Sequence, residues 1–530
     1  MFCITRNLTT TIELNLIGES VLKTVAVFFA WLGLVASAHG EQRFEFASFA
    51  IPGDGRIVVP VAEGESLSGI AATIDQRTNG ALTVAATEAV FIGEADSTLT
   101  LFGVSPYSRI DLIGVGPETV SRSAAENFGG AAASLLADTK GGSVQILWDV
   151  DNADPEATAA RAAFGYLLRS YRFDKYQAKK VDPDTLPVVR LFSDDNSQAA
   201  FDDDLVHLAA GVFFARNMPS EPANIVYPQV FVDLAKAQFD GLDNVAIKVL
   251  DEEDIQRLGM GALWGVGKGS TRPPRLLIIE YMAGGDSPPV VLAGKGITFD
   301  TGGISLKDND GMWAMKGDLG GAAVVTGTVL AAARRGAKIN VVALAALAEN
   351  MPSGTAIRPG DILTSMSGIT IEIISTDAEG RLVLADAVHY GQVTYEPSVL
   401  IDVATLTGSA GRALGDDYAA VFGRHDQLIE QLAAAAKAAN EAVWRLPLDD
   451  SHFKQIESKF ADIVNSGAGN PGASVGAAFI GSFVAEDQVW AHFDIAGVDL
   501  LEEDRPTVPA GYSGWSVRTL DEYLRRHHQR

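Results

Sequence analysis

Charged side chains alternate with very small residues in the segment STDAEGRLVLADAV at 375–388. Asp377, Glu379 and Arg381 occupy every second position, and only alanine and glycine lie between them. If this stretch is extended, the two-residue period of a strand puts the three charged groups on one face, where small neighbours allow the backbone to approach closely. The spacing would present two carboxylates to a cation and a guanidinium to an adjacent anion. Taken alone, such a pattern is more often a solvated strand edge.

Further candidate residues follow apolar runs that are typical of buried strands. Lys295, Asp300 and Lys307 come after VVLAG, and Asp318 lies in a glycine-rich segment that leads into a helix. The segment TLTG follows SVLIDVA. Each has an ordinary explanation when taken alone, such as an ion pair for a lysine or a simple strand exit for TLTG. Their joint placement is what indicates a site. The candidates are Lys295, Asp300, Lys307, Asp318, Thr405, Leu406 and Gly408.

Four carboxylates of this set could not all stay ionised in one cleft without compensating charge. Divalent cations would supply it, because an oxygen-rich site suits hard or borderline metals. The only cysteine is Cys3, which excludes a thiolate metal site or a disulfide in the folded body. None of the eight histidines falls in these segments, and no phosphate-cradling loop is evident. A di-metal phosphoesterase is therefore the weaker of two enzymatic hypotheses. The four acids are Asp300, Asp318, Asp377 and Glu379.

The elements that must position these residues alternate between apolar runs and helical patterns. Continuous apolar runs separated by helices indicate a parallel sheet covered on both faces, with ligands bound beyond the carboxyl ends of the strands. The predicted helices of this half span 321–336 and 381–395. The predicted strands span 274–282, 288–296, 339–350, 370–376 and 398–408.

A length of 530 residues predicts two domains. We expect an α/β fold in which each domain has a mostly parallel or mixed sheet flanked by helices, with the active site at the strand carboxyl ends of the C-terminal domain. The predicted division is an N-terminal domain over 42–197, a connecting helix over 198–222 and a catalytic domain over 223–530. In the first half, strands are predicted at 55–64, 97–106, 143–150 and 187–193, and helices at 155–176 and 202–222.

Residues 1–41 form a signal-like or disordered segment by sequence. An apolar run and the small-residue pattern ASA at 36–38 resemble a secretory signal, although Glu13 and Glu19 make a poor leader before it. A true start at Val21 would reconcile the two, and a mature N-terminus before residue 21 would refute that hypothesis. The apolar run is too short for a comfortable membrane span, so no stable membrane insertion is expected.

The whole chain is acidic, with a net charge of 41 − 67 = −26. This charge disfavours nucleic-acid binding through the overall field. A hydrophobic content of 47% is that of a well-cored globular protein, so extensive disorder is not expected.

Several segments together resemble the leucine aminopeptidase (cytosol aminopeptidase) family, peptidase family M17. The resemblance covers about residues 44–527, and the segment at 375–388 is its most specific part. The chain departs from the family pattern at Ser375, where asparagine is usual, and near Trp313, Ala314 and Gly317, where bulkier or acidic residues are usual, which bears on substrate preference. The matching segments are GKGITFDTGGISLK, MKGDLGGAA, ENMPSG, RPGD, STDAEGRLVLADA, IDVATLTG, YRFDKY, WAHFDIAG and GYSGWSVRTLDEYL.

The resemblance implies a metallo-exopeptidase that releases N-terminal amino acids, of leucine type and broad, from peptides with a free N-terminus. Two divalent metal ions per subunit are implied, Mn or Zn, with Mg as a further option. One ion would be held by Lys295, Asp300, Asp318 and Glu379, and the other by Asp300, Asp377 and Glu379. Lys307 and Arg381 would be catalytic, with bicarbonate at Arg381 as the base. Lys307, Thr405, Leu406 and Gly408 would contact substrate.

The resemblance also implies a homohexamer and a cytoplasmic location, whereas a functional signal at 21–38 would mean a periplasmic or exported protein. Two non-enzymatic alternatives share the fold: a non-catalytic hexameric scaffold and a DNA-binding accessory protein. The acidic net charge argues against the second, and the filled ligand positions argue against the first.

Overall fold

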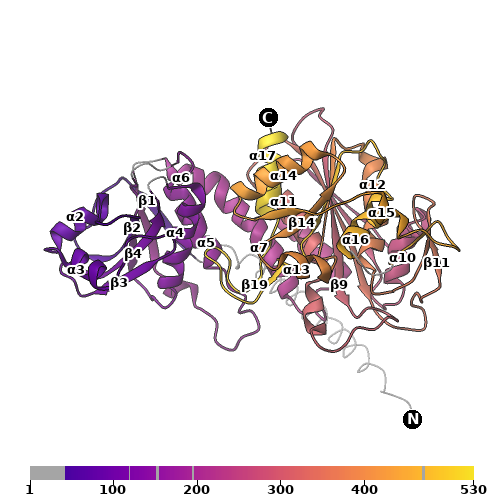
Figure 1. The fold of residues 1–530 in the computed structure, drawn as a ribbon, viewed down its shortest axis with the longest axis horizontal. Helices are drawn as coiled ribbons and strands as arrows, with labels where there is room; N and C mark the ends of the chain where they lie inside the picture. Colours follow the sequence, from indigo (N-terminus) through magenta and orange to yellow (C-terminus); the bar gives the residue numbers. More distant parts are fainter. Residues whose placement is uncertain (1–41, 118–119, 151–153, 194–195, 468–471, 530) are drawn as a thin grey trace, which may run out of the picture.

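The computed structural model describes residues 42–117, 120–150, 154–193, 196–467 and 472–529, so the signal-like segment lies outside the described residues. Two α/β units lie side by side, joined by the long helix α7, which spans Val206–Ser220 (Figure 1). A mixed α/β fold with two sheets flanked by helices confirms the expected fold class. Among these described residues, no helix has the length and apolar character needed to cross a membrane.

The N-terminal unit contains a six-stranded sheet in the order β1-β6-β5-β2-β4-β3. All pairs are parallel except β3 with β4, and the four strands predicted in this half are confirmed with small changes in length. The strands are β1 Phe44–Ala47, β2 Gly55–Ala62, β3 Thr98–Phe102, β4 Tyr107–Gly116, β5 Ser143–Leu147 and β6 Val188–Phe192. The helices are α2 Gly69–Arg77, α3 Ala81–Glu88, α4 Arg122–Leu135 and α5 Ala159–Arg169.

The helix predicted over 155–176 is shorter in the structure, where α5 spans Ala159–Arg169. The chain beyond it is held as a loop by side-chain contacts to the end of α7. Tyr171 Oη donates to Asn217 Oδ1 at 2.8 Å, and Tyr176 Oη donates to Glu221 Oε2 at 2.5 Å. These tertiary hydrogen bonds outweigh the local helical pattern.

The C-terminal unit is built on an eight-stranded sheet in the order β15-β14-β17-β13-β9-β10-β8-β7. Its four central strands are parallel, β7 and β8 are antiparallel to their neighbours, and β14 is antiparallel to β17 but parallel to β15, so the sheet is mixed, as the expected mostly parallel or mixed sheet allows. The strands are β7 Val245–Leu250, β8 Arg275–Met282, β9 Val290–Asp300, β10 Asn340–Asn350, β13 Val399–Ala404, β14 Ala419–Gly423, β15 Val443–Arg445 and β17 Trp490–Asp494.

The strand predicted at 370–376 does not belong to this sheet. Only Thr370–Glu372 is a strand, β12, and it pairs with β11 (Ile362–Thr364) and β16 (Ile463–Val464) in a separate three-stranded sheet. An apolar run shows that a strand is buried but not which sheet it joins, because the partners come from distant parts of the chain. A further short pair is β18 Leu500–Leu501 with β19 Gly511–Tyr512.

Helices cover both faces of the large sheet, as predicted. Alternate residues of β8, β9 and β10 face two different cores, one shared with α7, α8, α11, α14 and α17 and the other with α9, α10, α12 and α16. The first layer is α8 Pro228–Phe239, α11 Gly320–Arg334, α14 Asp426–Ala438 and α17 Val517–His527, together with α7. The second is α9 Glu252–Arg257, α10 Gly261–Gly267, α12 Gly380–Tyr395 and α16 Gly472–Gly481. The short helices α13 Gly408–Leu414 and α15 Asp450–Lys454 flank these layers.

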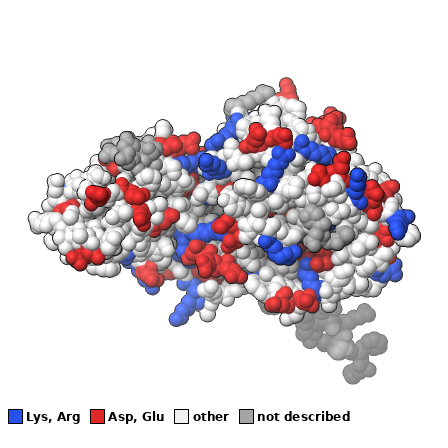
Figure 2. All heavy atoms as spheres, in the orientation of Figure 1, with Lys and Arg blue, Asp and Glu red and all other residues white. Residues whose placement is uncertain are grey.

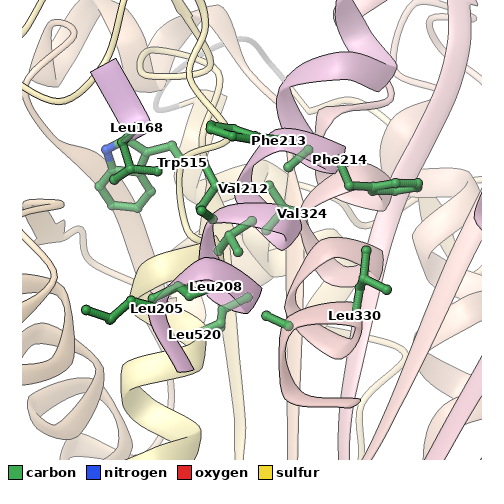
Figure 3. Close-up of a cluster of buried hydrophobic side chains, with 14 of the residues drawn as sticks. Leu168, Leu205, Leu208, Val212, Phe213, Phe214, Val324, Leu330, Trp515 and Leu520 are labelled. Carbon is green, nitrogen blue, oxygen red and sulfur yellow. The ribbon is translucent and has the colours of Figure 1, made fainter. Parts of the chain in front are cut away.

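Helices α7 and α11 cross at a pair of glycines. A Cβ atom on Gly211 would lie 2.3 Å from the Gly327 carbonyl oxygen, and the converse distance is 2.4 Å, so neither position tolerates a side chain. Around this crossing, buried apolar side chains of α7, α11 and α17 interdigitate with Leu168 of the N-terminal unit (Figure 3). Because α11 begins at Gly320, two residues after Asp318, this packing fixes the position of one candidate carboxylate.

A buried ion network also joins the two units. Glu126 on α4, with no exposed surface, faces Arg122 at 3.4 Å, Arg161 at 3.2 Å and Arg518 of α17. Arg122 in turn donates to Glu522 of α17 at 2.8 Å. The C-terminal helix is therefore tied electrostatically to the N-terminal unit.

Candidate active site

The first candidate carboxylate stands at the carboxyl end of β9. Asp300 is the last residue of that strand and pairs in register with Asn350, the last residue of β10. Its Oδ1 accepts hydrogen bonds from Asn350 Nδ2 and from the Gly302 backbone amide, both at 2.8 Å. These two donors orient the carboxylate and leave its Oδ2 free to contact Lys307 on the opposite side.

Lys307 lies between two carboxylates. Its Nζ is 2.8 Å from Asp300 Oδ2 and 2.5 Å from Asp377 Oδ1. The turn that returns the chain to this position uses Gly302 and Gly303 in the left-handed region, at φ 84° and 67°. A Cβ on Gly302 would lie 2.7 Å from Asp377 Oδ1, so the glycine also leaves room for that carboxylate.

Lys295 is the centre of a second cluster of charged side chains, and it lies within β9, five residues before Asp300. Its Nζ, on a side chain only 4% exposed, lies 2.7 Å from Asp318 Oδ1 and 3.1 Å from Glu379 Oε1, and it donates to the Thr405 carbonyl at 2.9 Å. Thr405 Oγ1 donates to the same Asp318 oxygen at 2.7 Å. The five predicted ligand residues therefore converge in one place, called the cleft below, between the carboxyl-terminal half of β9 and the starts of α11 and α12.

The expected extended conformation over 375–381 is wrong. Glu379 is helical, at φ −83° and ψ −33°, and it caps α12, which already includes Arg381. Asp377 lies in the preceding turn, where its amide donates to Ser375 Oγ at 3.2 Å. The close approach that small residues allow is nevertheless present, because a Cβ on Gly380 would lie 2.3 Å from Lys295 Cε.

Arg381 consequently lies apart from the two lysine clusters. Its Nη1 donates to the Asn465 carbonyl at 3.0 Å, and burial lowers the pKa of its guanidinium. Its Nε is buried and has no hydrogen-bond partner among the described residues. A Cβ on Gly476 of α16 would approach Arg381 Nη2 to 3.5 Å and Leu406 Cδ2 to 3.0 Å, so these groups share one wall.

The cleft contains more negative than positive charge. Four carboxylates face two lysines, which gives 2 − 4 = −2 if all are ionised. Burial and the nearby Glu379 raise the pKa of Asp300 to about 6, and burial raises the pKa of Asp318 well above its usual value. Burial alone would lower the pKa of Lys295 and Lys307, but the surrounding carboxylates outweigh it and raise both.

Two observations indicate that the cleft suits divalent cations. Asp318 Oδ2 and Glu379 Oε2 are buried and have no hydrogen-bond partner among the described residues. Asp300, Asp377 and Glu379 each present one oxygen within 4.8 Å of the others. Uncompensated buried carboxylate oxygens are costly, whereas hard or borderline dications prefer such oxygen ligands.

Some residues at this site were not identified from the sequence. Asn350 orients Asp300, Asn465 accepts from Arg381, and Asp494 contacts the 405–408 loop. Asn350 and Asp494 end β10 and β17, so the rule that polar residues follow parallel strands could have found both. Asn465 has no such signal, because it follows the two-residue strand β16 of the separate three-stranded sheet, which the sequence did not predict.

Comparison with known proteins agrees with this geometry. Residues 213–521 match the model of the cytosol aminopeptidase family catalytic domain, and residues 58–180 match that of its N-terminal domain. The chain belongs to the cytosol aminopeptidase family, peptidase family M17. It is accordingly a peptidase of the aminopeptidase class, with two domains, which confirms the resemblance drawn from its segments.

Individual relatives match almost the full chain. The probable cytosol aminopeptidase of Caulobacter vibrioides is 44% identical over 480 residues, covering 88% of this chain and 95% of the relative. That of Methylorubrum populi is 42% identical over 493 residues, covering 90% and 96%.

Among solved structures, a mutant of tomato leucine aminopeptidase is 29% identical with a TM-score of 0.82, over 93% of this chain and 98% of that one. The bottromycin maturation enzyme BotP in complex with Mn is also 29% identical, with a TM-score of 0.78, over 90% and 99%.

Proposed function

We propose that this family member is a two-metal aminopeptidase that releases leucine-type N-terminal residues, with broad preference, from peptides with a free N-terminus. The observation that carries the proposal is the convergence of four carboxylates and two lysines near the strand ends, where two buried carboxylate oxygens have no partner in the part of the chain that the structure describes. The Mn complex of BotP supports divalent metals in this family. Mn and Zn are the expected ions, with Mg as a further option.

The proposed ligand sets are those that the family resemblance implies, and the grouping of these side chains supports them. Lys295, Asp300, Asp318 and Glu379 would hold one ion, and Asp300, Asp377 and Glu379 the other. When bound, such ions acidify a water molecule, polarise the scissile carbonyl and take the free α-amine of the substrate. Lys295 can ligate only as the free amine, so its proton must leave on metal binding, and uptake should release protons.

Two further side chains would act on the reacting atoms. Lys307, held between Asp300 and Asp377, would donate to the carbonyl oxygen and stabilise the negative charge that develops there. Arg381, whose buried Nε has no partner among the residues that the structure describes, would hold an anionic base such as bicarbonate. That base would take the proton of the attacking water and return it to the leaving amine. Thr405, Leu406 and Gly408 would line the substrate side of the cleft.

The proposed assembly is a homohexamer in the cytoplasm, with residues 42–197 as the N-terminal domain, 198–222 as the connection and 223–530 as the catalytic domain. A sedimentation experiment that gives a monomer would refute the hexamer. Cell fractionation would distinguish the cytoplasm from the periplasm, the alternative if residues 21–38 act as a signal.

The non-catalytic scaffold and the DNA-binding accessory role are not favoured. On the face shown in Figure 2, Lys and Arg side chains lie interspersed with Asp and Glu, over a chain of net charge −26. Such a surface offers little attraction to a polyanion.

The test is release of free leucine from a leucyl dipeptide by purified residues 42–530. The protein is assayed after chelation, after addition of Mn²⁺ or Zn²⁺, and with the N-acetylated dipeptide. We expect release only with metal and a free amine. A folded, assembled protein that releases no leucine with any metal would contradict the proposal and favour the scaffold.

A further inference from the structure

The loop at 405–408 donates hydrogen bonds to the Asp494 carboxylate, to which the proposed mechanism assigns no role. We propose that Asp494 is a positioning residue that fixes this loop and, through it, the Lys295 amine and the Asp318 carboxylate. The inference rests on the proposed function, because it concerns two groups assigned there to metal ligation.

Asp494 lies beside the point where the chain leaves β13. It is the last residue of β17, is 1% exposed, and pairs in register with Ala404, the last residue of β13. Its Oδ1 accepts from the backbone amides of Leu406, Thr407 and Ala496, at 3.1, 3.3 and 3.2 Å. Its Oδ2 accepts from Thr407 Oγ1 at 2.6 Å. One carboxylate thus satisfies two consecutive amides and a hydroxyl of the loop.

The residue just before these contacts faces the proposed metal ligands. The Thr405 carbonyl accepts from Lys295 Nζ at 2.9 Å, and Thr405 Oγ1 donates to Asp318 Oδ1 at 2.7 Å. Three consecutive residues therefore link Asp494 to both groups. Thr407 Oγ1 also accepts from the Ala410 amide at 3.2 Å, which caps α13 and fixes the other end of the loop.

The contacts require an ionised carboxylate rather than any polar group. Burial of a charge is unfavourable unless several donors compensate it, and here four donors do so. An asparagine would keep one acceptor oxygen but would present an NH₂ group to the Thr407 hydroxyl, whose oxygen already accepts from the Ala410 amide and from Ser409 Oγ. We expect the loop to shift, and Lys295 and Asp318 to lose their common support.

Asp402 offers a matched control. It is also fully buried, on the adjacent strand β13, and it accepts from Trp490 Nε1 at 2.8 Å and lies 2.5 Å from His492 Nδ1. These partners are in the sheet rather than in the loop. Asp402→Asn therefore reproduces the loss of a buried carboxylate without disturbing residues 405–408.

The experiment compares wild type, Asp494→Asn and Asp402→Asn in the full chain. Mn²⁺ affinity is measured by titration of the chelated protein, together with the thermal midpoint, kcat and KM for a leucyl dipeptide. We expect both variants to lose thermal stability, but only Asp494→Asn to bind Mn²⁺ about tenfold more weakly and to lose roughly ten- to hundredfold in kcat/KM.

The outcomes separate the two proposals. If Asp494→Asn matches Asp402→Asn in Mn²⁺ affinity and kcat/KM, the positioning role is overturned while the proposed function stands. If the wild type releases no leucine, the proposed function fails, and the Mn²⁺ affinities alone decide the positioning role. Should Asp494→Asn not fold, Thr407→Val removes the shared hydroxyl bond from the other side and should weaken Mn²⁺ binding in the same direction.

Discussion

Replacement of Lys307 by alanine should separate turnover from stability. The Lys307 ammonium is the group that keeps Asp300 and Asp377 together, at 2.8 and 2.5 Å. Carboxylate oxygens of this cluster lie within 4.8 Å of one another, and at an effective dielectric constant of about 20 two such charges repel by about 3.5 kcal/mol. Because the Asp377 side chain is 35% exposed, solvent screens part of this repulsion, and we expect the chelated variant to lose about 2 kcal/mol.

Bound dications supply the same compensation, so Mn²⁺ should restore most of that stability. It should not restore turnover, because in the proposed mechanism the lost ammonium would also stabilise the developing oxyanion, and we expect kcat to fall roughly 100- to 1,000-fold. The assay is urea unfolding of chelated and Mn²⁺-loaded protein, combined with steady-state kinetics and metal content.

Lys316→Ala is the control for this variant, since Lys316 Nζ donates to the Ser220 carbonyl at 2.8 Å and to no carboxylate of the cleft. A Lys307→Ala protein that keeps its turnover within a few-fold of wild type would refute the catalytic role. One that loses bound metal together with turnover would show that the residue is structural.

Three further predictions concern residues around the site and between the two units. Glu126→Gln should lower the free energy of unfolding by about 3 kcal/mol, because three guanidiniums lose their shared buried carboxylate; an unchanged urea midpoint would show that the network contributes nothing. Gly380→Ala should leave the protein folded by circular dichroism but abolish metal binding, since its Cβ would lie 2.3 Å from Lys295 Cε; normal metal content would contradict this. Burial raises the pKa of Asp499 to about 7, above the roughly 3.9 of an unfolded chain, so the unfolded state loses this proton first as pH rises. The free energy of unfolding should therefore fall between about pH 4 and pH 7. In urea titrations over this range, Asp499→Asn should reduce the slope of free energy against pH by the equivalent of about one proton. An identical slope in the variant and the wild type would mean that Asp499 is already ionised in the folded protein.

The sequence was sufficient to predict the strand that carries Lys295 and the helix that follows Asp318, although β9 continues beyond the predicted end at 296 to include Asp300. These elements have long, continuous apolar patterns bounded by glycine or proline, and burial on both faces is what such patterns encode. The sequence was not sufficient to predict the direction of the strands near the sheet edges, because a strand such as β8 would show the same apolar run in a parallel or an antiparallel pairing.

The conformation of residues 375–381 illustrates the other limit. Alternation of charged and small residues favoured an extended chain, but Asn465 Oδ1 accepts from the backbone amides of Ile374 and Ser375, at 2.8 and 3.3 Å, and α12 begins at Gly380. Asn465 lies some ninety residues away in the chain. The turn that brings Asp377 and Glu379 to the two lysines is therefore fixed by a tertiary contact that no local pattern contains.

The most direct test of the two-metal site is anomalous diffraction from crystals of the Mn²⁺-loaded protein, recorded near the Mn absorption edge. The account predicts two peaks per chain, one within ligand distance of Lys295, Asp318 and Glu379 and the other of Asp377 and Glu379, with Asp300 between them. A single peak, or peaks away from these carboxylates, would contradict it.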